Sequence, residues 1–214
     1  MYVKVCGLTT AEAAVVAVEA GADAVGVVVS ASSPRHLTAD AARTVVAAAR
    51  QAAATRPLDV VLVTAELSAD EAVRSARSIG ADVVQLHGSR YTADDFRTVV
   101  ASGLRLWRAT SLDDAPDLTV GAHGEDVLLL DAPRPGSGER WDPALLVGRT
   151  PHGQWLLAGG LDPDNVADAI AAARPWGVDV SSGVEQSRGV KDLAKVRAFV
   201  LAARAAELRG ATQD

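Results

Sequence analysis

Eight short apolar runs recur along this 214-residue chain, and most of them show no alternation of apolar and polar residues. Continuous apolar runs of this kind are typical of strands that are covered on both faces, as in a parallel sheet. We therefore expect eight buried strands. They cover residues 3–6, 24–29, 59–63, 83–86, 104–108, 127–130, 155–158 and 178–180.

Alanine-rich segments that fit helices lie between these runs. The expected helices cover residues 10–20, 38–52, 68–78, 92–101, 163–173 and 192–208, with a weaker one at 141–147. The sequence SLDDAPDLTVGAHG, at residues 111–124, reads mostly as loop. The fifth helix should therefore be short or missing.

A second repeat runs through the chain, in which a glycine, one further residue and an aspartate stand before every second strand. It begins at Gly21, Gly80, Gly124 and Gly177, where a glycine with positive φ can close the preceding helix. Strand and helix thus alternate in units of about 27 residues, near the minimum for one βα unit. Because βα crossovers are right-handed, eight such units close into a barrel.

The predicted fold class is α/β, a (β/α)8 TIM barrel that forms one small domain over residues 1–214. The alternative is an open doubly wound sheet. That fold would carry a glycine-rich phosphate-binding turn after its first strand, and CGLTT at residues 6–10 is a poor match.

Composition argues against several classes of function. The formal net charge of −6 and the 4% aromatic content argue against nucleic acid as a partner. The first residues do not resemble a signal peptide, and no apolar run approaches the ~20 residues of a membrane helix. One cysteine cannot form an internal disulfide, and the four histidines are scattered. We expect a cytoplasmic protein with no membrane partner and no metal site of the clustered His/Cys type.

The C-terminal ends of the strands form the active-site face of such a barrel. The only cysteine, Cys6, ends the first strand and Asp131 follows the sixth, so the two should face each other across the barrel mouth. One could act as general base and the other as general acid if their surroundings separate their pKa values. Alternatively, Cys6 is a small buried apolar residue and Asp131 caps a turn. Arg108, which ends the expected fifth strand, should reach the same rim.

Two turns of small residues, LAGGLDP and VSSGVE, follow the seventh and eighth strands. Loops at these places often bind phosphate in barrels, because glycine lets the backbone approach and serine adds a hydroxyl donor. The expected phosphate-binding residues are Gly159, Gly160, Ser182 and Gly183. The alternative is that both segments are simply tight turns.

Two further side chains are candidates for ligand contact. Arg35, in the segment SSPRHL, is either a fork that grips a substrate carboxylate or a solvated surface residue. His87 ends the fourth strand in VVQLHG and either lines the pocket or packs at its rim.

In their order along the chain, these segments resemble the phosphoribosylanthranilate isomerase family of tryptophan biosynthesis. The resemblance covers nearly the whole chain. Its motifs are KVCGLTTAEAAVVAVEAGADAVGVV, SSPRHLT, DVVQLHG, LLLDAPRPGSGERWD, LLAGGLDPDNVADAI and GVDVSSGVEQSRGVKDLAKVRAF. Members of that family are small eight-stranded barrels that use no metal or organic cofactor and occur as monomers or homodimers.

The resemblance implies an Amadori rearrangement of a small phosphorylated substrate, N-(5'-phosphoribosyl)anthranilate, to 1-(2-carboxyphenylamino)-1-deoxyribulose 5-phosphate. It implies that Asp131 protonates the furanose ring oxygen as general acid, and that Cys6 removes the C2 proton as general base. Arg35 would hold the anthranilate carboxylate. The phosphate would be held by Gly159, Gly160, Ser182 and Gly183.

Two alternatives stay open at this point. A related isomerase of the histidine type acts on aminoaldose phosphates, but such enzymes carry aspartate on the first strand, where this chain has Cys6. A non-catalytic barrel that binds a phosphorylated sugar would keep both small-residue turns, whereas Cys6 and Asp131 would have no chemical role.

Overall fold

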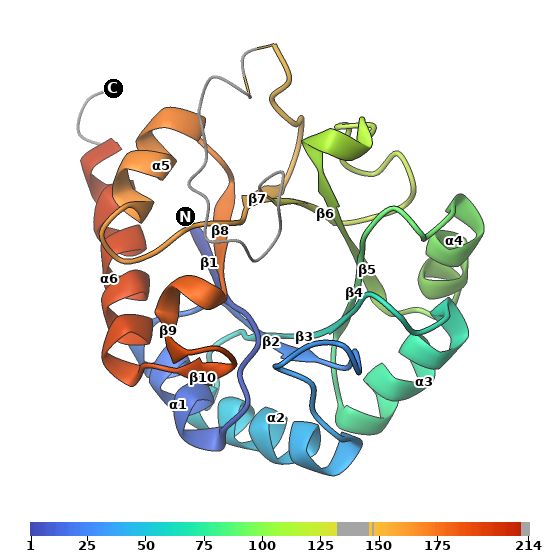
Figure 1. Ribbon diagram of the computed structural model, residues 1–214, viewed down its shortest axis with the longest axis horizontal. Coiled ribbons are helices and arrows are strands. Elements are labelled where there is room, and N and C mark those ends of the chain that lie inside the picture. The colour runs from blue at the N-terminus through green and yellow to red at the C-terminus, as the bar shows by residue number, and fades with distance from the viewer. Residues whose placement is uncertain (132–145, 147, 211–214) are drawn as a thin grey trace.

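Eight parallel strands close into a barrel in chain order, and helices surround it (Figure 1). The structure is a computed structural model that describes residues 1–131, 146 and 148–210. The strands are β1 (Tyr2–Val5), β2 (Ala24–Val28), β3 (Asp59–Thr64), β4 (Val83–His87), β5 (Arg105–Ser111), β6 (Val127–Asp131), β7 (Trp155–Leu157) and β8 (Gly177–Val180). Because β8 pairs in parallel with β1, the sheet has no open edge and the predicted TIM barrel is confirmed.

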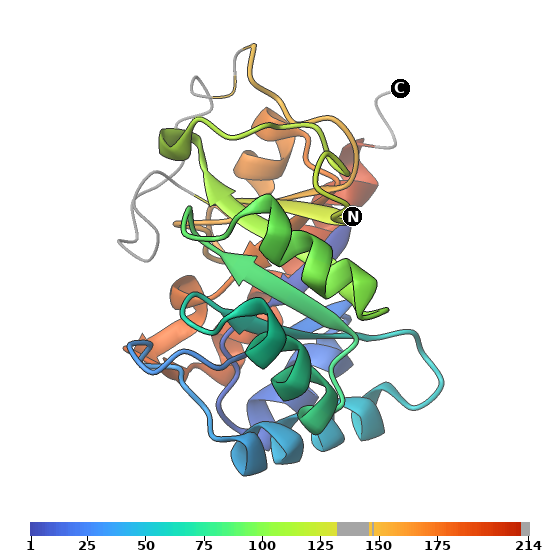
Figure 2. The ribbon, with the colours of Figure 1, turned by 90° about the vertical axis from the view of Figure 1, so that its right-hand side faces the viewer.

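The helices lie on the outside of the barrel, as the side view shows (Figure 2). They are α1 (Ala11–Ala20), α2 (Ala39–Ala53), α3 (Ala69–Ile79), α4 (Ala93–Ala101), α5 (Val166–Ala173) and α6 (Leu193–Gly210). Hydroxyl caps fix where α1 and α3 begin: Thr10 accepts a hydrogen bond from the Ala13 amide, and Ser68 forms a capping box with Glu71. The six expected helices are confirmed. The weaker helix expected at 141–147 lies, except for Leu146, outside the described residues.

The strands carry two apolar cores because successive side chains point to opposite faces. On β1, Val3 and Val5 are buried in the layer between the strands and the helices. The intervening residues Tyr2, Lys4 and Cys6 point into the barrel, where Cys6 belongs to a second buried cluster. Covered faces on both sides explain why the strands lack apolar–polar alternation.

Two of the four repeated glycines close helices as expected. Gly21 follows α1 and Gly80 follows α3, and both adopt the left-handed conformation. Gly124 also has a positive φ, of 83°, but it ends a turn that begins at Gly121 and not a helix.

The expectation for Gly177 was wrong. This residue is the first of β8, and α5 ends four residues earlier with Arg174 as its left-handed cap. A Cβ at position 177 would lie 2.5 Å from the Tyr2 carbonyl oxygen, so the glycine allows β8 to approach β1. The aspartate of this repeat, Asp179, therefore lies within its strand, whereas Asp23 and Asp82 stand before theirs.

The connection from β5 to β6, all of which the structure describes, contains only a 3₁₀ turn, η1 (Leu112–Asp114), in place of a helix. This agrees with the expected short or missing fifth helix. β5 runs three residues beyond Arg108, and the position level with Asp131 is Ser111. Arg108 therefore does not reach the rim, and its placement there was wrong. Its side chain is buried on the outer side, where Nε donates to Glu125 Oε1 at 2.7 Å.

The loop after β8 contains a hairpin that the sequence did not reveal. A 3₁₀ turn, η3 (Ser182–Val184), leads into β9 (Glu185–Ser187) and β10 (Val190–Lys191) before α6 begins. Thr9 Oγ1 donates to the Gly189 carbonyl oxygen at 3.3 Å, which ties the hairpin to the loop after β1. Within the part of the chain that the structure describes, no helix is long and apolar enough to span a membrane.

Candidate active site

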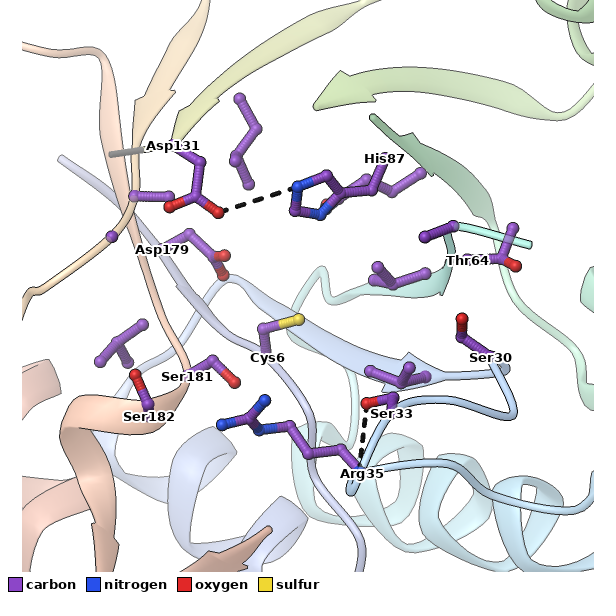
Figure 3. A pocket seen from close by; sticks show the side chains of 18 of the residues that line it. Cys6, Ser30, Ser33, Arg35, Thr64, His87, Asp131, Asp179, Ser181 and Ser182 are labelled. Carbon is purple, nitrogen blue, oxygen red and sulfur yellow. Dashed lines mark hydrogen bonds and ion pairs between the residues drawn. The ribbon is translucent and has the colours of Figure 1, made fainter. Parts of the chain in front are cut away.

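A cavity of about 270 Å³ opens at the C-terminal ends of the barrel strands (Figure 3). Seven of the eight predicted site residues line it. They are Cys6, Arg35, His87, Asp131, Gly159, Gly160 and Ser182. The structure thus brings together residues from the ends of six strands and the loops that follow them, at the face where barrels carry their active sites.

Cys6 lies at the floor of the cavity, directly after β1, and only 7% of the residue is exposed. Its neighbour on β2 is Gly26, where a Cβ would lie 2.9 Å from the sulfur, so glycine leaves the space that the thiol occupies. Burial raises the pKa of the Cys6 thiol, and the charge of Lys4 opposes that rise. The thiol is therefore mostly protonated at neutral pH, and its thiolate, once formed, is a strong base.

Asp131 and His87 lie on the opposite side of the cavity. They end β6 and β4, and the Nε2 atom of His87 is 3.9 Å from Oδ2 of Asp131. Burial lowers the pKa of His87, so its imidazole is neutral at pH 7. His87 lines the pocket, which was the first of the two predicted possibilities.

The two small-residue turns, which follow β7 and β8, lie next to each other at one edge of the cavity. Gly159 and Gly160 have φ values of 89° and 63°, a conformation that side chains rarely adopt. Asn165 donates from Nδ2 to the Gly160 carbonyl oxygen at 2.8 Å and holds this turn in place. Ser182 stands beside it at the start of η3.

Gly183 is absent from the cavity wall, and it serves the packing of the two turns. A Cβ at position 183 would overlap the carbonyl oxygen of Leu161 in the turn after β7. Glycine at this position lets the turn after β8 approach the turn after β7. Its own contact with phosphate stays a prediction.

Arg35 reaches the cavity from the loop after β2 and is fixed by a carboxylate. Its Nε and Nη2 atoms donate to Oε1 and Oε2 of Glu185 at 2.6 and 3.0 Å. Glu185 also accepts from Lys191 Nζ at 3.0 Å and from the Gly189 amide at 3.0 Å. Burial tends to raise the pKa of Glu185, but these donors, first among them Arg35, bring it below its ordinary value. Arg35 is thus an ordered member of a charge network and not a solvated surface residue.

Several charged residues at the site were not predicted from the sequence. Asp179 lines the cavity, and its Oδ1 atom accepts from the fully buried Lys4 Nζ at 2.8 Å. The sequence contains a signal for both residues. Lys4 shares the inward face of β1 with Cys6, and Asp179 lies within its strand, whereas the aspartates of the other repeats stand before theirs. The link from Glu185 to Arg35 spans 150 residues and depends on the unpredicted hairpin.

Comparison with known proteins agrees with this geometry. A family model described as N-(5'phosphoribosyl)anthranilate (PRA) isomerase matches residues 3–202. The chain belongs to this family. The match confirms the resemblance identified from the ordered motifs.

Relatives and solved structures in the phosphoribosylanthranilate isomerase family match over nearly the whole chain. N-(5'-phosphoribosyl)anthranilate isomerase of Geobacter sp. (strain M21) is 44% identical over 208 residues, which cover 94% of this chain and 97% of the relative. The crystal structure of TrpF from Jonesia denitrificans is 53% identical with a TM-score of 0.87, and the match covers 97% of this chain and 98% of that one.

A third match is a phosphoribosyl anthranilate isomerase in complex with reduced 1-(o-carboxyphenylamino)-1-deoxyribulose 5-phosphate. It is 30% identical with a TM-score of 0.80, and the match covers 96% of this chain and 99% of that one.

Proposed function

We propose that the chain catalyses the reaction of its family, the Amadori rearrangement of N-(5'-phosphoribosyl)anthranilate to 1-(2-carboxyphenylamino)-1-deoxyribulose 5-phosphate, in tryptophan biosynthesis. The observation that carries this proposal is the placement of a buried thiol, Cys6, and a carboxyl group, Asp131, in one cavity. The reaction needs a proton donor at the sugar ring oxygen and a proton acceptor at C2, and these two groups supply them.

Substrate binding is assigned to the two ends of the ligand. The phosphate lies at the turns after β7 and β8, held by Gly159, Gly160, Ser182 and Gly183. The anthranilate carboxylate lies against Arg35. Glu185 engages Nε and Nη2 of this guanidinium, and a guanidinium has five N–H donors, so donors on Nη1 and Nη2 remain for the substrate.

The first chemical step opens the ribose ring. Asp131 donates a proton to the furanose oxygen as the bond between that oxygen and C1 breaks. The nitrogen lone pair of the anthranilate forms a double bond to C1, which gives a protonated Schiff base. His87, close to Asp131, is neutral, so it can donate one hydrogen bond and accept another at the sugar hydroxyls.

The second step moves a proton from carbon. The Cys6 thiolate removes the proton from C2, the C2–H electron pair forms a C1–C2 double bond, and the iminium nitrogen takes up the displaced pair. The resulting enolamine becomes the ketone when C1 gains a proton and the C2 hydroxyl loses one, so the overall reaction is an isomerisation. A thiolate suits this step because it is a stronger base toward a carbon-bound proton than an exposed carboxylate of pKa about 4.

The remaining expectations are proposals too. The reaction needs no metal or organic cofactor, and the ligand is a small phosphorylated molecule. The chain works in the cytoplasm, consistent with its single cysteine, as a monomer or a homodimer.

Direct turnover tests the proposed function. Phosphoribosylanthranilate is generated in situ, and the loss of its fluorescence is followed with wild type and with Cys6→Ser. We expect rapid loss with wild type and at least ~10²-fold slower loss with Cys6→Ser, because the general base is gone.

Binding of the aminoketose product, measured by calorimetry on both proteins, separates the alternatives. Retained binding without turnover in Cys6→Ser supports an enzyme. Binding by a wild type that gives no turnover would instead identify a non-catalytic phosphosugar-binding barrel and would refute the proposal.

A further inference from the structure

A fully buried ammonium group lies beneath the cavity floor. The side chain of Lys4 has 0% exposure, and its Nζ atom donates to Asp179 Oδ1 at 2.8 Å. The two residues are register partners on β1 and β8. Burying a charge in a barrel interior is costly even when it is paired, so the pair calls for an explanation beyond packing.

The position of the Lys4–Asp179 pair relative to the Cys6 thiol supplies such an explanation. Lys4 and Cys6 are two residues apart at the end of β1, so both side chains point into the barrel. Asp179 and Cys6 both line the cavity, and they lie next to each other at its floor (Figure 3). Lys4 precedes Cys6 by two residues and is absent from the cavity wall, so it lies one inward-facing position deeper in the barrel than the thiol.

Charged groups on β1, β8 and β10 act on the thiol. Lys4 on β1 and Lys191 on β10 favour the thiolate, and Asp179 on β8 opposes it. Among the residues that the structure describes, the other titratable groups lining the cavity are Arg35, which pairs with Glu185, and His87 and Asp131. Lys4 exerts the largest of the electrostatic effects on Cys6, and only burial itself has a greater influence on the thiol pKa.

We propose that Lys4 is a positioning residue whose buried ammonium stabilises the Cys6 thiolate, and that Asp179 holds the ammonium under the sulfur. This inference rests on the proposed function because it explains how a base forms in a buried site. A phosphate dianion entering the cavity disfavours a second anion there, and a fixed positive charge below the thiol offsets that effect.

The test measures the thiol without using turnover. Cys6 is the only cysteine in the chain, so the rate of alkylation by iodoacetamide as a function of pH reports its pKa alone. The variants are Lys4→Met and the double variant Lys4→Met/Asp179→Asn, which removes both charges and leaves no unpaired ion. The matched control is Lys195→Met, an exposed lysine on α6.

We expect Lys4→Met to raise the thiol pKa by about one unit or more, since it loses a favourable charge and leaves Asp179 unopposed. The double variant should lie between wild type and Lys4→Met, and Lys195→Met should match wild type. A thiol pKa equal to that of wild type in both Lys4 variants would overturn the proposal. Circular dichroism confirms folding, and the double variant decides the question if the single variant does not fold.

The pH profile of kcat/KM keeps this inference separate from the proposed function. If the pH below which kcat/KM falls rises together with the thiol pKa, the role of Lys4 and the proposed function are both supported. If the thiol pKa moves and that pH does not, Lys4 stabilises the thiolate but Cys6 is not the base.

Discussion

At the scale of single residues, the site depends on partners that fix the side chains before a ligand arrives. Arg35 donates hydrogen bonds to Glu185, and the Glu185 carboxylate also accepts from Lys191 and from the Gly189 amide. Sequence position alone located Cys6, because it follows a strand end and strand ends define the barrel mouth. The partners escaped prediction, since pairing depends on side-chain direction and on a hairpin without a strong sequence signal.

The proposed contact of Arg35 with the substrate carboxylate gives a prediction. Arg35→Ala should raise KM roughly 10- to 100-fold with a much smaller change in kcat, because a charged hydrogen-bonding partner is lost at a distance from the reacting atoms. Steady-state kinetics check this. Glu185 keeps its bonds to Lys191 and Gly189, so the hairpin should stay in place. Arg43→Ala, an exposed arginine on α2, is the control and should leave KM unchanged; an unchanged KM in Arg35→Ala would place the carboxylate elsewhere.

At the scale of elements, the link between β5 and β6 shows how a barrel tolerates a missing helix. Arg108 points outward from β5, where it binds Glu125 and donates from Nη2 to the Asp117 carbonyl oxygen at 2.6 Å. Glu125 Oε2 accepts from the His123 amide at 2.8 Å. A buried ion pair thus anchors a helix-free loop. The loop was predicted from the sequence. The predicted strand ended too early, at Arg108, because the polar residues Thr110 and Ser111 that follow are not typical of a buried strand.

Removal of this anchor should affect stability and not catalysis. Arg108→Ala should lower the free energy of unfolding by about 3 to 5 kcal/mol, because the buried carboxylate of Glu125 loses its positively charged partner and keeps only the His123 amide. The value of kcat should stay near wild type, since the side chain points away from the cavity. Urea unfolding and steady-state kinetics check the two parts.

Arg105→Ala is the matched control, since Arg105 lies on the same strand and pairs with Asp59 in a more exposed position. Its loss should be smaller, about 1 kcal/mol or less. Equal losses in the two variants, or a large fall in kcat for Arg108→Ala, would contradict the outward anchoring role.

At the scale of the whole molecule, the βα repeat carried most of the information about the fold. Eight apolar runs without alternation predicted a barrel, and its closure follows from the pairing of β8 with β1. The repeat led to a wrong prediction at Gly177, because this glycine does not close a helix but allows β8 to approach β1 closely. That exception places Asp179 inside the barrel, beside the thiol, so the departure from the fold's regularity coincides with the site.

The central claim is that Asp131 opens the ring and that Cys6 then removes the C2 proton. Turnover of substrate carrying deuterium at C2 tests it most directly, with Cys6→Ser and Asp131→Asn compared side by side. Asp131→Asn should lower kcat roughly 10²-fold, the usual scale for a lost general acid. Ring opening then limits its rate, so deuterium should have little effect. In Cys6→Ser the C2 step limits the rate, and deuterium should slow turnover clearly. A clear isotope effect in Asp131→Asn together with none in Cys6→Ser would contradict the account.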